Sequence, residues 1–236
     1  MSGELTPLNS AASTRSFVYN LSMVDKIEII KQWLGSGAIN IFGIQFAGKD
    51  TLGIPLAEKL GAVFISSGDL VRAAMHNESD SRIRQAAIDS QTGILTPTDE
   101  FRQLIVPHLK DERLAGKPLV LGSVGRWIGE EDAVMDALNE GGHPLKAVIV
   151  LHIPVDEVWR RWEDVKHTRN GGRADDQDRS RVQLRLDEFN DKTMPVIQKY
   201  EQLGLVIDIN ATDTIEATFA SAIDQLYLRA AAETTD

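Results

Sequence analysis

The sequence predicts an α/β protein in which a parallel sheet of five short strands lies between layers of helices. Short apolar runs alternate with segments of helical apolar spacing, which is the pattern of βαβ units. One run, 147–153, is apolar almost throughout, as in a parallel strand that is buried on both faces. A glycine-rich segment stands between the first apolar run and the helical pattern that follows it.

The composition indicates one globular domain of ordinary size. The chain has 236 residues, 42% of them hydrophobic, and no cysteine, so it has no disulfides and no thiolate zinc site. Its net charge of −10 argues against a nucleic-acid-binding surface or attraction to anionic membranes. No apolar run reaches the ~18 residues of a membrane-spanning helix, and the N-terminus lacks a signal-peptide core. We therefore expect a cytoplasmic protein without nucleic-acid or membrane partners. A monomer is the expected state, although the composition does not determine it.

The expected elements follow one another along a single domain. Residues 1–20 form a polar, flexible tail, 21–36 an additional N-terminal helix, 37–230 the main domain and 231–236 a second tail. The expected strands are 38–42, 62–65, 117–121, 147–153 and 205–209, and the helices include 51–60, 99–113, 131–139 and 179–202. Pro55 is expected in the first turn of its helix, because proline lacks the N–H that later turns need.

The segment from Gly43 to Thr51 is a near-complete phosphate-binding loop. It matches the first seven positions of G-x-x-x-x-G-K-[ST], whereas the eighth position is Asp50 and the hydroxyl comes one residue later, at Thr51. In such a loop, backbone N–H groups surround phosphates at a helix N-terminus, the lysine contacts the outer phosphates and the hydroxyl binds Mg²⁺. We therefore expect a P-loop NTPase three-layer sandwich. The expected ATP-binding residues are Gly43, Ala47, Gly48, Lys49, Asp50 and Thr51.

Polar motifs follow the later strands, at the sheet edge where open α/β sheets bind ligands. The motifs are Ser66-Ser67-Gly68-Asp69-Leu70-Val71-Arg72, Gly93-Ile94-Leu95-Thr96-Pro97, Gly122-Ser123-Val124-Gly125-Arg126 and Arg173-Ala174-Asp175-Asp176, the last followed by a helix with Arg185.

Together these motifs resemble those of the adenylate kinases, in the nucleoside monophosphate kinase family, from about residue 38 to 229. The segment 66–72 is similar to the family's Ser-Thr-Gly-Asp-x-x-Arg, and 93–97 to its Gly-x-Leu-Val-Pro. Arg126 matches the arginine of Asp-Gly-Phe-Pro-Arg, Arg161 the arginine before the lid, and 173–176 the lid's Arg-x-Asp-Asp. The short segment before Asp176 resembles the short-lid members, which hold no zinc.

The resemblance implies that the γ-phosphoryl group of MgATP passes to a nucleoside monophosphate, most simply AMP. It also implies small insertions for the monophosphate, about 66–96, and for a lid, about 163–176. Guanidinium groups suit this chemistry, because the transferred group spreads its charge over three oxygens. The implied catalytic residues are Lys49, Arg126, Arg161, Arg173 and Arg185. The implied monophosphate-binding residues are Ser67, Gly68, Arg72, Arg126 and Glu130. The implied Mg²⁺ site consists of Thr51 and, through water, Asp69.

Two departures from the family pattern concern the phosphates. Phe46 stands at a glycine position and lacks glycine's tolerance of positive φ, so it is expected to reshape the loop. Gly122 replaces the family's strand-three aspartate, which steers Mg²⁺ through water, and Asp50 follows the lysine. Asp50 either partly replaces that aspartate, together with Asp69, or caps the helix N-terminus.

Two further departures concern the monophosphate and the lid. Glu130 stands where the family often has a glutamine that contacts adenine. An ionised carboxylate only accepts hydrogen bonds, so Glu130 either suits guanine, with its adjacent donors, or faces solvent in the first turn of a helix. Arg185 lies one residue further from Arg173 than in the family, and Val165 replaces a lid arginine. The alternative functions are a kinase for another monophosphate such as GMP, or a nucleotide-binding sensor or adaptor with impaired catalysis.

Overall fold

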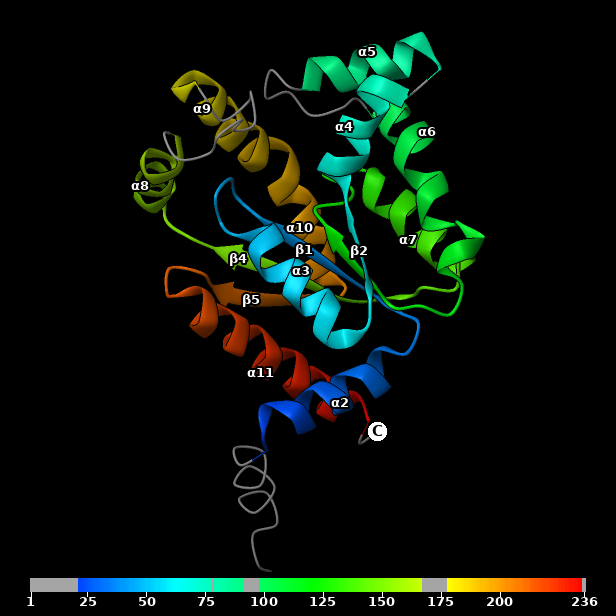
Figure 1. The fold of residues 1–236 in the computed structure, drawn as a ribbon, viewed down its shortest axis with the longest axis vertical. Helices are drawn as coiled ribbons and strands as arrows, with labels where there is room; N and C mark the ends of the chain where they lie inside the picture. Colours follow the sequence, from blue (N-terminus) through cyan, green and yellow to red (C-terminus); the bar gives the residue numbers. More distant parts are fainter. Residues whose placement is uncertain (1–20, 78, 91–97, 167–177, 235–236) are drawn as a thin grey trace, which may run out of the picture.

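The computed structural model describes residues 21–77, 79–90, 98–166 and 178–234. These residues form a parallel sheet in the order β2-β3-β1-β4-β5 (Figure 1), which confirms the predicted α/β class. The strand bounds lie within two residues of those predicted. The strands are β1 (Ala38–Gly43), β2 (Val63–Ser66), β3 (Leu119–Gly122), β4 (Leu145–His152) and β5 (Val206–Asn210).

Helices cover both faces of the sheet and so complete the three layers. One face carries α2 (Met23–Leu34), α3 (Lys49–Leu60) and α11 (Ile215–Glu233), and the other α6 (Thr98–Leu109), α7 (Glu130–Glu140) and α10 (Met194–Gln202). Two groups of helices stand beyond the sheet on opposite sides (Figure 1): α4 (Ser67–Asn77) and α5 (Ser81–Asp89) next to α6, and α8 (Val155–Lys166) next to α9 (Arg179–Glu188). A 3-10 turn, η2 (Glu112–Leu114), precedes β3.

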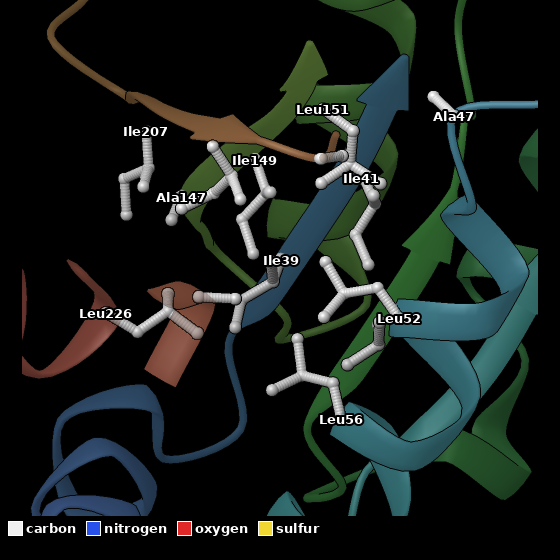
Figure 2. Close-up of a cluster of buried hydrophobic side chains, with 14 of the residues drawn as sticks. Ile39, Ile41, Ala47, Leu52, Leu56, Ala147, Ile149, Leu151, Ile207 and Leu226 are labelled. Atoms are coloured by element: carbon white, nitrogen blue, oxygen red, sulfur yellow. The ribbon is translucent and has the colours of Figure 1, made fainter. Parts of the chain in front are cut away.

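Strand β1 lies at the centre of the core, and all of its residues are buried. Ile39 and Ile41 pack against Leu52 and Leu56 of α3 (Figure 2), whereas Phe42 packs on the opposite face against α10. Each of these fully buried side chains contributes about 1.5–3 kcal/mol of transfer free energy. The start of α3 is therefore held close to the end of β1.

Helix α2 is an addition before the first strand. Ser22 and Asp25 form a capping box at its N-terminus, and Ile30 is fully buried on its core-facing side. Lys26 forms an ion pair with Asp224 of α11 at 2.8 Å. The expected tail 1–20 and residues 235–236 lie outside the described residues. The expectation of a tail from residue 231 is wrong in part, because α11 continues to Glu233. The other proposed domain bounds stay a prediction.

Three expectations about helices are wrong. The predicted helix 99–113 ends at Leu109, and the separate 3-10 turn η2 covers Glu112–Leu114. Helix α3 begins at Lys49 rather than Thr51, because Gly48 is its N-cap, and Pro55 therefore lies in its second turn. The predicted helix 179–202 is divided by a π-helical turn, η4 (Phe189–Thr193), between α9 and α10. In this wide turn the N–H of Met194 donates to the carbonyl of Phe189.

Two glycines make room for the ring of Phe64. A Cβ atom on Gly53 of α3 would lie 2.5 Å from Cε2 of Phe64, and one on Gly122 would lie 3.3 Å from its Cζ. The Phe64 ring therefore fills the wall between α3 and the end of β3. A larger residue at position 122 would have to displace this ring.

We predict that Gly53→Ala destabilises the protein by about 1–3 kcal/mol, because the added methyl group overpacks the contact with Phe64. Urea denaturation would measure the change in the free energy of unfolding. The double substitution Gly53→Ala/Phe64→Leu should recover part of the loss, and Ile54→Ala at a neighbouring exposed position is the control. Stabilisation by Gly53→Ala, the outcome that helix propensity alone favours, would contradict this packing argument.

Candidate active site

A cavity of about 380 Å³ opens where β1 ends and α3 begins. This volume is typical of small-molecule sites, which span about 300–1,000 Å³. Three segments line the cavity: the loop and first turn of α3 (45–52), the end of α8 and the start of α11 with the turn before it. The cavity brings together the predicted residues Ala47, Gly48, Lys49, Asp50, Thr51 and Arg161.

The loop keeps two left-handed backbone positions. Gly48 has φ 93°, and Phe46 has φ 64°. Phe46 itself adopts this conformation although it lacks glycine's tolerance of positive φ, at a cost of about 1–3 kcal/mol. That Phe46 reshapes the loop stays a prediction. Its ring packs against the core around α3, and its carbonyl accepts a hydrogen bond from Nη1 of Arg161 at 3.2 Å. These contacts hold a strained residue in place.

Lys49 is the first residue of α3, and its ammonium group is held inside the loop. Nζ donates hydrogen bonds to the carbonyls of Gly43, at 2.8 Å, and Ile44, at 3.1 Å. The positive end of the helix dipole lies at the same point, so the site favours an anion. Asp50 is not the N-cap, since Gly48 has that position, and the capping alternative for Asp50 is wrong. Asp50 lines the cavity instead.

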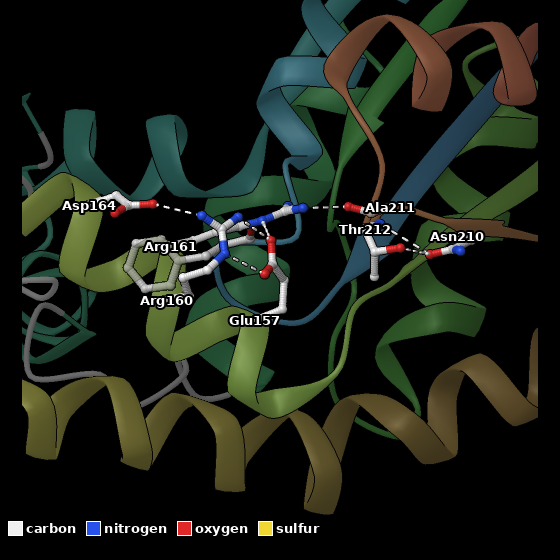
Figure 3. Close-up of polar contacts among 8 residues, drawn as sticks. Glu157, Arg160, Arg161, Asp164, Asn210, Ala211 and Thr212 are labelled. Atoms are coloured by element: carbon white, nitrogen blue, oxygen red, sulfur yellow. Dashed lines mark hydrogen bonds and ion pairs between the residues drawn. The ribbon is translucent and has the colours of Figure 1, made fainter.

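Arg161 joins three segments in the wall of the cavity (Figure 3). Nε donates to Glu157 at 2.6 Å, Nη2 to the carbonyl of Ala211 at 2.6 Å, and Nη1 to the loop. Hydrogen bonds from Arg160 and Arg161 lower the pKa of Glu157 to about 2, so this carboxylate stays ionised at neutral pH. In this arrangement Arg161 supports the cavity wall, and its role at the transferred phosphoryl group stays a prediction.

A second polar group lies where β2 ends and α4 begins. The Ser67 hydroxyl donates to the carbonyl of Gly122, which ties α4 to the end of β3. The guanidinium group of Arg72 lies over Gly68, where an added Cβ would come within 3.1 Å of Nη1, and pairs with Asp69. The structure thus places Ser67, Gly68, Asp69 and Arg72 within the first turns of one helix. The predicted role of Asp69 toward Mg²⁺ stays a prediction.

Glu130 holds the loop that carries Arg126. Its Oε2 accepts hydrogen bonds from the backbone N–H groups of Arg126, at 2.8 Å, and Trp127, at 3.1 Å. The residue is 1% exposed, so the alternative that it faces solvent is wrong. Burial raises the pKa of Glu130, and this shift is opposed by the hydrogen bonds from the Arg126 and Trp127 N–H groups, by the charge of Arg126 and by the Thr98 side chain. The other oxygen, Oε1, is buried and has no hydrogen-bond partner among the residues that the structure describes.

Sequence reasoning missed Asn40, which clamps the same loop from the sheet. Asn40 is fully buried in the middle of β1. Its Nδ2 donates to the carbonyl of Val124 at 2.7 Å, and its Oδ1 accepts from the Val124 N–H at 3.2 Å. Ser123 has φ 55° and donates to the Ile41 carbonyl. The sequence feature that could have pointed to this contact is the position of Asn40, a polar amide side chain within the otherwise apolar run 38–42.

Several predicted residues cannot be placed in the site. Arg173, Asp175, Asp176 and the segment 93–97 lie outside the described residues. Arg185 lies in α9, on the opposite side of the site from α4. Within the described ranges, no group of three or more acidic or histidine side chains could hold a metal ion. None of the helices described is both long and apolar enough to span a membrane.

A phosphate-binding loop at the end of a central parallel strand, flanked by arginine-bearing segments, defines a nucleotide-binding phosphotransferase. A family model described as adenylate kinase matches residues 41–205. The adenylate kinase of Bacteroides thetaiotaomicron is 30% identical over 192 residues, covering 80% of this chain and 98% of the relative. That of Hyphomonas neptunium is 32% identical over 184 residues, with coverages of 76% and 93%.

The chain therefore belongs to the adenylate kinase family and is an enzyme of the nucleoside monophosphate kinase class. A third relative, the adenylate kinase of Streptococcus pyogenes, is 30% identical over 201 residues, covering 76% of this chain and 93% of the relative. The matched region includes the walls of the cavity formed by the loop and α8, together with Arg126 and Arg185, whereas the wall formed by residues 211–218 lies beyond it.

We predict that Asn40→Val lowers the free energy of unfolding by about 1–3 kcal/mol, because it leaves the buried N–H and carbonyl of Val124 without partners. Thermal or urea denaturation would measure the loss. Ile41→Val, at the next position of the same strand, is the control for a change in buried volume alone, with an expected cost of about 0.5–1.5 kcal/mol. An equal or smaller loss in Asn40→Val would contradict the proposed clamp.

Proposed function

We propose that this enzyme transfers the γ-phosphoryl group of ATP, bound with Mg²⁺, to a nucleoside monophosphate, most simply AMP. The observation that carries the proposal is the position of Lys49, whose ammonium group lies inside the loop at the start of α3 and at the wall of the cavity. The names of the relatives, all adenylate kinases, support AMP as acceptor.

The two polar groups suggest a division of roles. The loop 43–51 would bind the phosphates of the donor through its N–H groups and Lys49, with the base and ribose in the cavity beside Arg161. Arg72 and Arg126 would hold the phosphate of the acceptor, since two guanidinium forks can orient its oxygens. Catalysis then consists of positioning and charge stabilisation, without a covalent intermediate.

The donor set near the loop fits Mg²⁺ that arrives with the nucleotide. Mg²⁺ usually binds substrate phosphates, water and one or two protein oxygens rather than a complete protein cage. Thr51, with its exposed hydroxyl in the first turn of α3, and Asp50 both line the cavity and would supply such oxygens. When bound, the ion would neutralise phosphate charge.

We predict that Lys49→Met lowers kcat about 10²–10³-fold, because it removes a preoriented donor from the transferred charge. A coupled assay of diphosphate formation from MgATP and AMP measures the effect. Lys59→Met, at an exposed position in the last turn of the same helix, is the matched control and should keep wild-type turnover. Wild-type rates in Lys49→Met would overturn the assignment of this loop. No turnover in the wild type, despite tight ATP binding, would favour a nucleotide sensor.

One observation favours a second acceptor, GMP. Oε1 of Glu130 is buried beside the Arg126 loop and has no hydrogen-bond partner among the described residues. An ionised carboxylate oxygen accepts hydrogen bonds, and so matches the N–H groups of guanine but repels the N1 lone pair of adenine.

We predict that Glu130→Gln shifts the ratio of kcat/KM for AMP over GMP about tenfold toward AMP, the factor given by ~1.4 kcal/mol of hydrogen-bond energy. The amide oxygen of glutamine can keep the bonds from Arg126 and Trp127, while its NH₂ group can donate to adenine. Asp132→Asn, an exposed change in the same helix turn, is the control. A ratio that stays within twofold of the wild type would remove Glu130 from base selection.

The remaining expectations stay predictions of the sequence. These are the cytoplasmic location, the monomeric state, the absence of nucleic-acid and membrane partners, the short lid at about 163–176 with Arg173, and the monophosphate insertion at about 66–96.

A further inference from the structure

Two predicted phosphate-binding arginines come from different parts of the fold. Arg126 lies in the loop after β3, and Arg185 in α9. Both would have to meet the phosphates in one geometry, because a misplacement of about 1 Å can cost 10²-fold in rate. The contacts of one lysine join these two segments.

Lys192 lies in the π-helical turn η4, between α9 and α10. Its Nζ lies 4.0 Å from the centre of the Trp127 ring, within cation–π range. The same Nζ forms an ion pair with Oε1 of Glu188 at 2.7 Å. The Glu188 side chain is 12% exposed and that of Lys192 is 31% exposed, so water screens these contacts less than it screens a surface pair.

Each partner of Lys192 is linked to one of the arginines. Trp127 follows Arg126 directly, and the backbone N–H groups of both residues donate to the same oxygen of Glu130. The hydrogen bonds to Glu130 therefore fix the backbone of Arg126 and of Trp127 together, and a contact with the Trp127 ring also acts on the position of Arg126. Glu188 lies three residues after Arg185 in the same region of α9, so the two share a helix face.

Lys192 lies in the π-helical turn and contacts Glu188 at the i,i+4 spacing at which helical side chains are neighbours. One additional residue in the turn changes the direction of the side chains that follow it, and π-helical turns occur frequently at functional sites. A second lysine, Lys199 of α10, binds Glu131 and Asp132 at the start of α7, at 2.7 and 2.8 Å. Helix α10 is thus attached to α7, and Lys192 extends this attachment to the Arg126 loop.

We propose that Lys192 is a positioning residue that, by binding Trp127 and Glu188 at once, sets the spacing between Arg126 and Arg185. This inference rests on the proposed function, because it assumes that both arginines act on the phosphates of one substrate pair. Lys192 itself does not contact the reacting atoms.

The test compares Lys192→Met, which keeps the aliphatic chain and removes the charge, with Lys192→Arg, which keeps a cation that can stack on an indole ring and bind a carboxylate. Lys26→Met is the matched control, because Lys26 also binds a carboxylate, Asp224 at 2.8 Å, and lies 6.0 Å from an aromatic ring, that of Tyr227, but in α2. For each protein, kcat, the KM of both nucleotides and the Tm are measured.

Lys192→Met is expected to lower kcat by about tenfold or more, within the ~10²-fold range of a small misplacement, with a change in Tm no larger than that of Lys26→Met. Lys192→Arg should restore kcat to within about threefold of the wild type, since the guanidinium group replaces both contacts. Combining Lys192→Met with Trp127→Leu should add little to either single effect, as expected for residues that act through one contact. Unchanged kcat in Lys192→Met, or full additivity in the double variant, would overturn the proposal.

A binding measurement separates this proposal from the proposed function. If the wild type phosphorylates no monophosphate, the proposed function fails. In that case the Kd of a bisubstrate nucleotide, two adenosines joined by five phosphates, tests the spacing directly by calorimetry. A tenfold or greater weakening in Lys192→Met, with rescue in Lys192→Arg, supports the positioning role, and an unchanged Kd overturns it.

Discussion

The burial of β1 is the constraint on which the rest of the structure depends. A strand that lies between two others and is covered on both faces ends at a fixed point. Helix α3 packs back on it through Leu52 and Leu56, so the chain must reverse within a few residues. Left-handed backbone at Phe46 and Gly48 makes that reversal possible. The apolar core therefore offsets the strain of the loop, and the same packing directs Lys49 and the N-terminal end of α3 toward the cavity.

The loop after β3 is held by polar contacts, namely hydrogen bonds to its backbone groups. Asn40 from β1, Ser67 from α4 and Glu130 from α7 all form hydrogen bonds with backbone groups of residues 122–127. Each donor or acceptor is buried, where an unmet hydrogen bond is costly. Hydrogen bonds from three separate elements, β1, α4 and α7, thus stabilise the same conformation of the loop that carries Arg126. A site built in this way needs little rearrangement of that loop when a phosphate binds, which favours positioning as the source of catalysis.

The sequence predicted the strands well, because buried parallel strands give apolar runs that tertiary contacts do not change, as in 147–153. It also predicted the strand, the glycine-containing turn and the helix around residues 43–51, because the pattern stands between a β-type run and helical apolar spacing. The sequence did not predict burial or backbone conformation where these depend on contacts between residues far apart in the chain. The burial of Glu130 follows from the turn of the Arg126 loop toward α7, and the left-handed Phe46 from support by Arg161 across the cavity. The π-helical turn at 189–193 has the same helical spacing as its neighbours, so periodicity alone could not separate it.

The wall beside the loop links one departure from the family pattern, Gly122, to the packing of Phe64. Phe64 occupies the space between α3 and the end of β3, and it can do so only because Gly53 and Gly122 have no side chains there. A Cβ atom at position 122 would lie 3.3 Å from Cζ of Phe64, so an aspartate there would require the ring to shift by a few tenths of an ångström. Removing Phe64 alone would open a cavity against α3, at a cost of several kcal/mol for a ring of this size. The apolar wall and the missing carboxylate at position 122 are therefore coupled. The carboxylates that line the cavity come from other segments: Asp50 from the loop, Asp164 from α8 and Asp213 from the turn before α11.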